Sequence, residues 1–186
     1  MASRVRVLGG LALVLALAAC GKPNGASAPE QPANPTEPAS APAPMTDAQK
    51  KALLAELPAA YQGANIENGE ARFAVCRACH TTVEGGQDMT GPNLWGVFGR
   101  KAGSKADFNY SDDMKNSGWT WDAARIDQWI TNPRAMLAGT KMTFIGMPNP
   151  QDRIDLIGYL KVATSPAPAE GAGAAASNAA ANATGQ

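Results

Sequence analysis

The five consecutive residues Cys76-Arg77-Ala78-Cys79-His80 constrain this chain more than any other feature. They form the C-x-x-C-H pattern that is typical of covalent haem attachment. Two thiols at this spacing can add across the two vinyl groups of a haem, and the adjacent imidazole can then bind the iron from one face. A chain with this pattern is predicted to fold around one large, flat, apolar group.

Two other kinds of site use closely spaced cysteines, and the rest of the sequence argues against both. A structural zinc ion takes four Cys or His ligands, whereas the chain after Cys20 offers only Cys76, Cys79 and His80. A thioredoxin-like redox motif is expected near a strand–helix–strand unit, but the flanking sequence is helical in pattern and poor in strand signals. We therefore expect one covalent haem c. Because His80 is the only histidine, ligation by two histidines of one chain is excluded.

The first residues, 1–19, have the pattern of a bacterial export signal. Arg4 and Arg6 give a positive start, and the apolar run at 7–18 is shorter than the roughly 20 residues that a membrane-spanning helix needs. The run ends in Leu-Ala-Ala-Cys-Gly, which resembles the lipobox of bacterial lipoproteins, with Cys20 as the lipidated residue. We expect an exported protein, anchored by Cys20 to the periplasmic face of a membrane. An ordinary signal peptide and an uncleaved anchor are the alternatives.

The chain divides into further segments by composition. Residues 20–45 are rich in proline and alanine and predict an extended tether. Residues 46–58 predict a short helix, which a capping-box pattern starts and a proline ends. The tail at 165–186 has no apolar periodicity and is predicted to be disordered. One folded domain is therefore expected, at residues 65–164.

Short sequence blocks precede and follow the haem motif in this domain. They are Asn68-Gly69-Glu70-Ala71-Arg72-Phe73, Thr90-Gly91-Pro92-Asn93-Leu94-Trp95-Gly96, Phe98-Gly99-Arg100-Lys101-Ala102-Gly103, Phe108-Asn109-Tyr110-Ser111, Trp119-Thr120-Trp121, Asn132-Pro133, Gly139-Thr140-Lys141-Met142-Thr143-Phe144 and Asp155-Leu156-Ile157-Gly158-Tyr159-Leu160. Present in this order, they resemble class I cytochromes c of the mitochondrial type. The likeness is strongest to the membrane-attached cytochromes c of alphaproteobacteria.

This resemblance implies an all-α domain with the class I cytochrome c fold, in which helices wrap around one covalently bound haem. The helix signals agree with it: we predict helices at 67–75 and 122–130, a short turn of helix after Asn132, and a last helix that starts at Asn149 and Pro150. In the family the first and last helices cross near the position of Gly69.

The second iron ligand must come from the sequence after His80, where five methionines are candidates. They are Met89, Met114, Met136, Met142 and Met147. Met142 lies in Gly-Thr-Lys-Met-x-Phe, which resembles the ligand loop of the family, and Met147 is the alternative. A lone methionine is more often a core residue, but the motif favours Met142 as a ligand. A thioether ligand raises the reduction potential, and a filled sixth site excludes oxygen and peroxide.

The resemblance also assigns roles around the haem. It implies that the Pro92 carbonyl orients His80, that Tyr110 and Trp121 donate to a buried propionate, and that Arg100 screens that propionate. Thr140 is expected to donate near the methionine sulfur, and Phe144 is expected to cover the haem edge.

Two positions depart from the mitochondrial pattern. Trp129 stands where a tyrosine usually approaches the ligand methionine, and Met114 stands where an asparagine is usual. We expect both departures to remove a small polar group from the methionine side of the haem. The usual hydrogen-bond network there is accordingly in doubt.

The function that follows from these features is electron carriage, not enzyme catalysis. By resemblance, the donor would be a cytochrome bc-type complex and the acceptor a terminal oxidase. A peroxidase or gas sensor would need an open sixth site, which Met142 argues against. A fixed subunit of a larger redox complex is a further alternative, although the long tether favours a domain that moves between partners.

Charge adds little to this interpretation. With 16 basic and 16 acidic side chains the formal net charge is zero, so nothing points to nucleic acid. We expect a monomer. Five cationic residues have two interpretations: they form a modest basic rim at the haem edge, or they are scattered, solvated side chains. The five residues are Arg77, Lys101, Lys105, Arg134 and Lys141.

Overall fold

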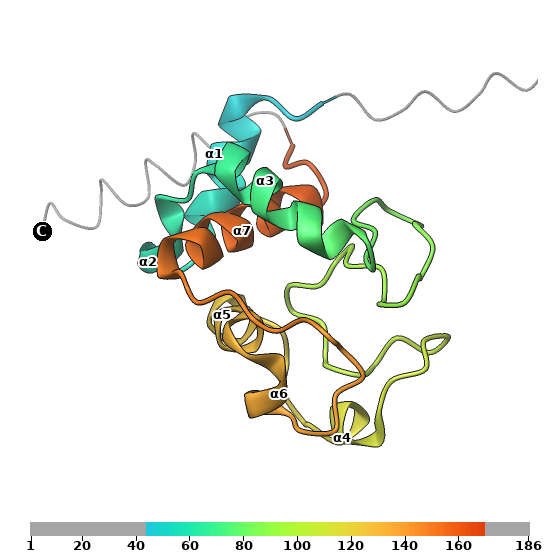
Figure 1. The fold of residues 1–186 in the computed structure, drawn as a ribbon. Helices are drawn as coiled ribbons and strands as arrows, with labels where there is room; N and C mark the ends of the chain where they lie inside the picture. The colour runs from blue at the N-terminus through green and yellow to red at the C-terminus, as the bar shows by residue number, and fades with distance from the viewer. Residues whose placement is uncertain (1–43, 170–186) are drawn as a thin grey trace, which may run out of the picture. The chain divides into compact units, whose positions relative to one another are not determined.

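The computed structural model of the protein describes residues 44–169, which contain seven helices (Figure 1). These described residues form no strand, only an isolated bridge between Lys101 and Thr120. No helix in the described part is long and apolar enough to cross a bilayer. The predictions for the export signal, for Cys20, for most of the tether and for the tail from residue 170 onward lie outside the described residues.

Helix bounds agree with the predicted start signals. The helices are α1 (Asp47–Ala55), α2 (Ala59–Gln62), α3 (Ile66–Arg77), α4 (Asp112–Lys115), α5 (Ala123–Thr131), α6 (Pro133–Met136) and α7 (Pro150–Ala163). The side chain of Asp122 caps α5, and that of Asn149 caps α7, each by accepting a hydrogen bond from a backbone N–H of the first turn. The one-turn helices α2 and α4 are not among the predicted elements, although Ser111 caps α4 by accepting a hydrogen bond from the backbone N–H of Met114.

The centre of the fold is the crossing of α3 and α7, which lie across one another in Figure 1. A Cβ atom on Gly69 of α3 would overlap the backbone carbonyl of Asp155 on α7, so glycine permits this close approach. Phe73 is 2% exposed, and its ring lies 5.4 Å from that of Tyr159. Ile157 is fully buried in the same layer.

The N-terminal helices α1 and α2 pack against α7, which the sequence alone did not reveal. The capping box at Thr46 and Gln49 is formed as predicted. Leu53 and Leu57 are buried, and Glu56 forms a 2.7 Å ion pair with Lys161 of α7. This segment is therefore part of the folded unit.

The start of the C-terminal tail also lies against α1. The side-chain amide of Gln49 donates to the carbonyl of Pro168 over 2.9 Å. Thr164 is fully buried, and Ser165 is 8% exposed. Ser165 and Pro168, at the start of the predicted tail, therefore lie against the helical core.

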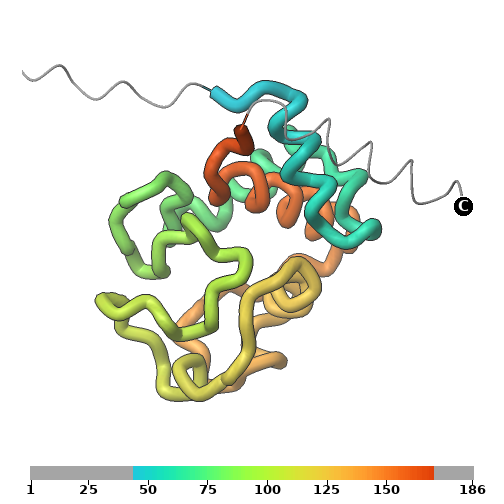
Figure 2. Tube along the Cα trace, turned by 180° about the vertical axis from the view of Figure 1, so that it is seen from behind, coloured from blue at the N-terminus to red at the C-terminus, as the bar shows by residue number. Residues whose placement is uncertain are grey.

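A long irregular segment, residues 78–111, connects α3 to α4 without a helix. Figure 2 shows it, in green, on the other side of the view from α1 and α2. Backbone hydrogen bonds fix its path: Gly96 donates to Thr164 at the end of α7, and Gly99 donates to Trp121 before α5. The segment forms one wall of the site described below.

Candidate haem site

One cavity of about 270 Å³ brings together all ten residues that the sequence singled out as site residues. They are Cys76, Cys79, His80, Pro92, Arg100, Tyr110, Trp121, Thr140, Met142 and Phe144. The walls come from α3, the irregular segment, α4, α5, the loop before α7, and α7 itself. Most of the other wall residues are apolar, among them Leu94, Val97, Ile126 and Leu160.

The C-terminal end of α3 places the two thiols and the imidazole on one wall. The carbonyl of Cys76 accepts hydrogen bonds from the backbone N–H groups of Cys79 and His80, each over 3.0 Å. This turn holds the three residues together. Burial, and then the neighbouring Cys79, raise the pKa of the Cys76 thiol to about 11. Redox-active C-x-x-C motifs instead have a lowered thiol pKa, so the environment argues against that alternative.

His80 is oriented by the backbone of the irregular segment. Its Nδ1 lies 2.7 Å from the carbonyl oxygen of Pro92, which can only accept, so the ring proton is on Nδ1 and Nε2 is free to bind a metal. Gly91 lies against the ring, and a Cβ atom there would overlap it. Burial lowers the pKa of His80 and Arg100 lowers it further, while the Pro92 hydrogen bond acts in the opposite direction. The net effect favours the neutral imidazole that serves as a ligand.

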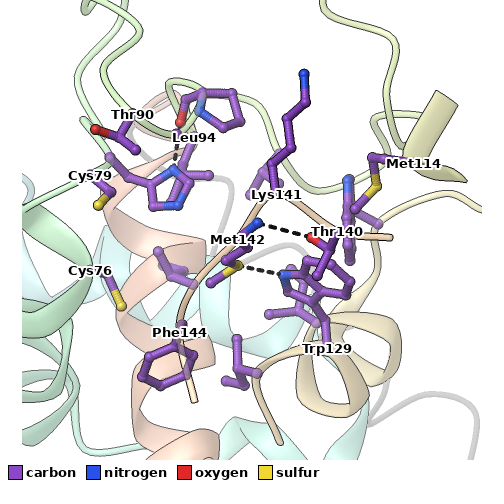
Figure 3. A pocket seen from close by; sticks show the side chains of 18 of the residues that line it. Cys76, Cys79, Thr90, Leu94, Met114, Trp129, Thr140, Lys141, Met142 and Phe144 are labelled. Atoms are coloured by element: carbon purple, nitrogen blue, oxygen red, sulfur yellow. Dashed lines mark hydrogen bonds between the residues drawn. The ribbon is translucent and has the colours of Figure 1, made fainter. Parts of the chain in front are cut away.

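On the methionine side, Met142 is held by two hydrogen bonds (Figure 3). Its backbone N–H donates to Thr140 Oγ1 over 3.1 Å, and its sulfur accepts from the indole N–H of Trp129 over 3.2 Å. The expectation that Trp129 removes a polar group from this side is therefore wrong. Trp129 lies on the buried face of α5, together with Ile126 and Ile130. The signal that could have identified its role is the N–H donor of the indole ring.

Of the other four candidate methionines, Met114 also lines the cavity, whereas Met89, Met136 and Met147 do not. Met147, the alternative ligand, is 8% exposed but is not among the cavity residues, and its backbone N–H donates to the carbonyl of Ile130. Met114 is buried on the cavity wall, where its side chain brings no hydrogen-bond donor, in agreement with the expected loss of a polar group at this position. Met89 is 49% exposed.

Three polar side chains border the cavity at the irregular segment and just before α5. Neither the Tyr110 hydroxyl nor the Trp121 indole N–H has a hydrogen-bond acceptor within residues 44–169, which leaves both available to a ligand in the cavity. Burial raises the pKa of Tyr110, which keeps it a donor at neutral pH. The guanidinium of Arg100 donates to the carbonyls of Asn93 and Trp95, both over 3.1 Å.

These residues fit a covalently bound haem. The site offers two thiols for the vinyl groups, an imidazole with a free Nε2, a thioether, and largely apolar walls that also carry hydrogen-bond donors. Gly91 leaves room for the imidazole, which no other residue type would. A bound haem would supply reversible one-electron chemistry at this place.

Comparisons with known proteins agree with this chemistry. Residues 66–164 match the family model described as Cytochrome c. The chain is 48% identical to cytochrome c2 of Rhodomicrobium vannielii over 101 residues, which are 54% of this chain and 81% of the relative. It is 49% identical to cytochrome c of Theileria annulata over 90 residues, which are 48% of this chain and 77% of the relative.

A solved structure shows the same fold. It is cytochrome cH from Methylobacterium extorquens, which is 43% identical, with a TM-score of 0.50 over 53% of this chain and 98% of that chain. The all-α class I cytochrome c fold expected from the sequence is therefore confirmed. The part of the chain that matches begins at α3 and ends with α7, so α1 and α2 lie outside the family model.

The match covers more than half of the chain, and the homologues carry electrons and are not enzymes. The family binds one covalent haem c, as expected from the C-x-x-C-H motif. This chain belongs to the cytochrome c family: it is a class I c-type cytochrome and an electron carrier.

Proposed function

We propose that this protein is a membrane-tethered electron carrier whose haem iron is ligated by His80 and Met142. The observation that carries the proposal is the placement of both side chains on the wall of one cavity, with the two motif cysteines beside them. The Pro92 carbonyl orients the imidazole, and the Trp129 indole orients the thioether. Each proposed ligand is thus oriented by one hydrogen bond with a neighbouring group: His80 donates its bond, and Met142 accepts its bond.

A ligand that is held in place favours carriage over catalysis. The Met142 backbone is bound to Thr140, its sulfur is bound to Trp129, and Phe144 follows two residues later on the same wall. A peroxidase or gas sensor needs a sixth site that opens easily. The remaining roles are proposed with the ligands: Tyr110 and Trp121 donate to a propionate, Arg100 screens its charge, and Phe144 covers the haem edge.

We further propose export and lipid attachment at Cys20, with residues 20–45 as the tether. The support is the sequence of residues 1–20, a short apolar run that ends in Leu-Ala-Ala-Cys. A tether on the membrane raises the effective concentration of the domain at partners on the same surface. The partners we propose are a cytochrome bc-type complex as donor and a terminal oxidase as acceptor, served by a monomer.

Fatty-acid labelling tests the anchor. Cells that produce the wild-type protein or the Cys20→Ser variant are given a labelled fatty acid, and the purified proteins are compared. Label in the wild type and none in the variant supports lipid attachment. Equal labelling of both proteins would show that the lipid, if any, is not on Cys20.

Tether shortening tests movement between partners. Deletion of residues 24–44 removes no residue of α1 or of the haem domain, so the visible spectrum and the potential are expected to stay the same. Electron transfer from the donor complex to the oxidase in membranes is expected to slow, because a short spacer cannot span both. Equal respiration with the short tether would favour a fixed relay in a larger complex.

A further inference from the structure

The N-terminal helices contact a helix that forms part of the haem cavity wall. Both α1 and α2 lie outside the residues that match the cytochrome c family model, yet α2 packs beside α7 (Figure 1). Tyr61 of α2 is 8% exposed, and its hydroxyl donates to Oδ2 of Asp127 on α5 over 3.4 Å. Burial, and then the Asp127 carboxylate, raise the pKa of Tyr61, so the phenol stays a donor at neutral pH. This contact joins α2 to α5.

The other oxygen of the Asp127 carboxylate is bound by Arg153 of α7. Nε of Arg153 donates to Oδ1 over 2.6 Å, and the side chains of this ion pair are 12% and 28% exposed. A short, charge-assisted hydrogen bond away from bulk water is stronger than a pair on the open surface. Each carboxylate oxygen therefore has a partner from a different helix, Tyr61 from α2 and Arg153 from α7.

Arg153 also holds the loop that contains Met142. We call this loop, residues 137–149 between α6 and α7, the ligand loop. Nη1 of Arg153 donates to the carbonyls of Met147 and Pro148 over 3.0 and 2.9 Å. The backbone N–H of Met147 in turn donates to a carbonyl of α5 over 2.8 Å. The end of the ligand loop is thus fastened to both α5 and α7.

These contacts form one chain of hydrogen bonds from α2 to the ligand loop. Groups in such a chain fix one another's positions, so the loss of one bond weakens the next. For Met142 to leave an iron, the ligand loop must move, and that movement would break the bonds from Arg153 to the two carbonyls. A carboxylate that Tyr61 holds in place favours the arrangement in which Arg153 reaches the loop.

We propose that the N-terminal helices hold the ligand loop in place through Tyr61, a positioning residue that keeps Met142 from leaving the iron. Tyr61 acts through the Asp127 carboxylate and the Arg153 guanidinium. The inference rests on the proposed ligation by Met142, and it gives α1 and α2 a role beyond joining the tether to the haem domain. An electron carrier gains from it, because a ligand that stays bound in both oxidation states needs little rearrangement.

Cyanide binding to the full-length ferric holoprotein, in detergent at pH 7, tests the proposal. Cyanide enters only after Met142 has left, so the limiting rate constant at saturating cyanide in stopped flow measures how often the ligand loop opens. Tyr61→Phe keeps the ring and removes only the hydroxyl; it is expected to raise this rate constant about threefold, through the lost hydrogen bond to a charged group. Asp127→Ala removes the acceptor of both partners and is expected to raise it about tenfold or more.

Two further variants separate positioning from general stability. The Tyr61→Phe/Asp127→Ala double variant should open no faster than Asp127→Ala alone, because Tyr61 acts through the carboxylate. Gln62→Ala is the matched control on the same helix: the Gln62 side-chain amide donates to the carbonyls of Ala55 and Leu57, and neither of these lies on α5. It should weaken the packing of α2 in denaturant unfolding and leave the cyanide rate constant near wild type. All variants should keep the far-red band.

The possible outcomes separate this inference from the proposed function. A Tyr61→Phe variant that opens at the wild-type rate, or a Gln62→Ala variant that is accelerated as much as Tyr61→Phe, overturns the inference alone. A double variant that opens faster than Asp127→Ala by the full effect of Tyr61→Phe shows that Tyr61 acts by another route and also overturns it. A wild-type protein that lacks the far-red band, or binds cyanide as fast as Met142→Ala, overturns the proposed ligation and the inference together.

Discussion

The indole N–H of Trp129 donates a hydrogen bond to the sulfur of Met142 over 3.2 Å. Trp129 is 8% exposed and belongs to a group of three indoles with Trp119 and Trp121, whose ring centroids lie 6.5 and 5.6 Å from its own. This packing fixes the direction in which the N–H points. The sulfur therefore meets a donor that the surrounding core holds in position.

Replacement of Trp129 by Phe is expected to lower the reduction potential by tens of millivolts. A hydrogen bond withdraws electron density from the sulfur and so disfavours the ferric state, and a neutral hydrogen bond contributes about 0.5–1.5 kcal/mol. Trp129→Tyr is the matched comparison, because Tyr and Phe differ only in the hydroxyl that can donate to Met142. Redox titration of both variants checks this. Equal potentials for the Phe and Tyr variants would mean that ring volume, not the hydrogen bond, sets the effect.

Replacement of Met142 by Ala is expected to abolish the weak far-red charge-transfer band of ferric haem with a thioether ligand. The open site should then bind cyanide or carbon monoxide readily. Met147→Ala is the control, since Met147 is equally a downstream methionine but does not line the cavity. That variant should lose stability, by about 2–5 kcal/mol for a buried Met, and should keep the band. The opposite pattern would identify Met147 as the ligand.

Replacement of Gly69 by Ala is expected to destabilise the protein by about 2 kcal/mol or more. The new methyl group would overlap the Asp155 carbonyl, and backbone cannot move aside as a flexible side chain can. The higher helix propensity of alanine offsets about 1 kcal/mol of this cost. Gly63→Ala, where nothing lies within 4 Å, should stay within about 0.5 kcal/mol of wild type. Denaturant unfolding followed by far-UV circular dichroism measures both.

Asp155 is expected to make stability depend on pH in the acidic range. It is 2% exposed, and burial raises its pKa, but hydrogen bonds from Asn65, Asn68 and Gln151 together with Arg72 outweigh burial and hold the pKa below its ordinary value. The folded state thus favours the carboxylate. Its stabilising contribution is fully present above the unfolded pKa of about 3.9 and is lost as the pH falls through the lower folded pKa.

The Asp155→Asn variant tests the direction of this dependence of stability on pH. It should be less stable than wild type at pH 7, by about 1.5–3 kcal/mol for lost hydrogen bonds to a charged group. The difference should shrink as the pH falls below 4, because wild-type Asp155 is then protonated as well. Asp47→Asn serves as control, since the Asp47 side chain is 99% exposed. A difference that stays constant with pH would mean that Asp155 acts through packing alone.

The sequence by itself determined the parts of this protein that depend on neighbouring residues. The thiols and imidazole of the haem motif are contiguous, and the caps at Thr46, Asp122 and Asn149 each act within three residues. Local interactions of this kind can be predicted without knowledge of the fold. The family blocks then located Met142 and the other cavity residues, all of which the structure brings to one place.

Only the tertiary structure decided how separate segments meet. The rotation of α5 about its axis aims the Trp129 N–H at Met142, and the sequence pattern fixes the buried face but not the direction of one donor. The packing of α1 on α7, through Leu53 and the Glu56–Lys161 pair, joins residues about 100 positions apart. Lys105 and Asp88 are only 17 positions apart, but their 2.7 Å ion pair, which neutralises one residue considered for a basic rim, likewise depends on how the irregular segment folds back on itself. Such contacts depend on the path of the backbone in space, which no local pattern specifies.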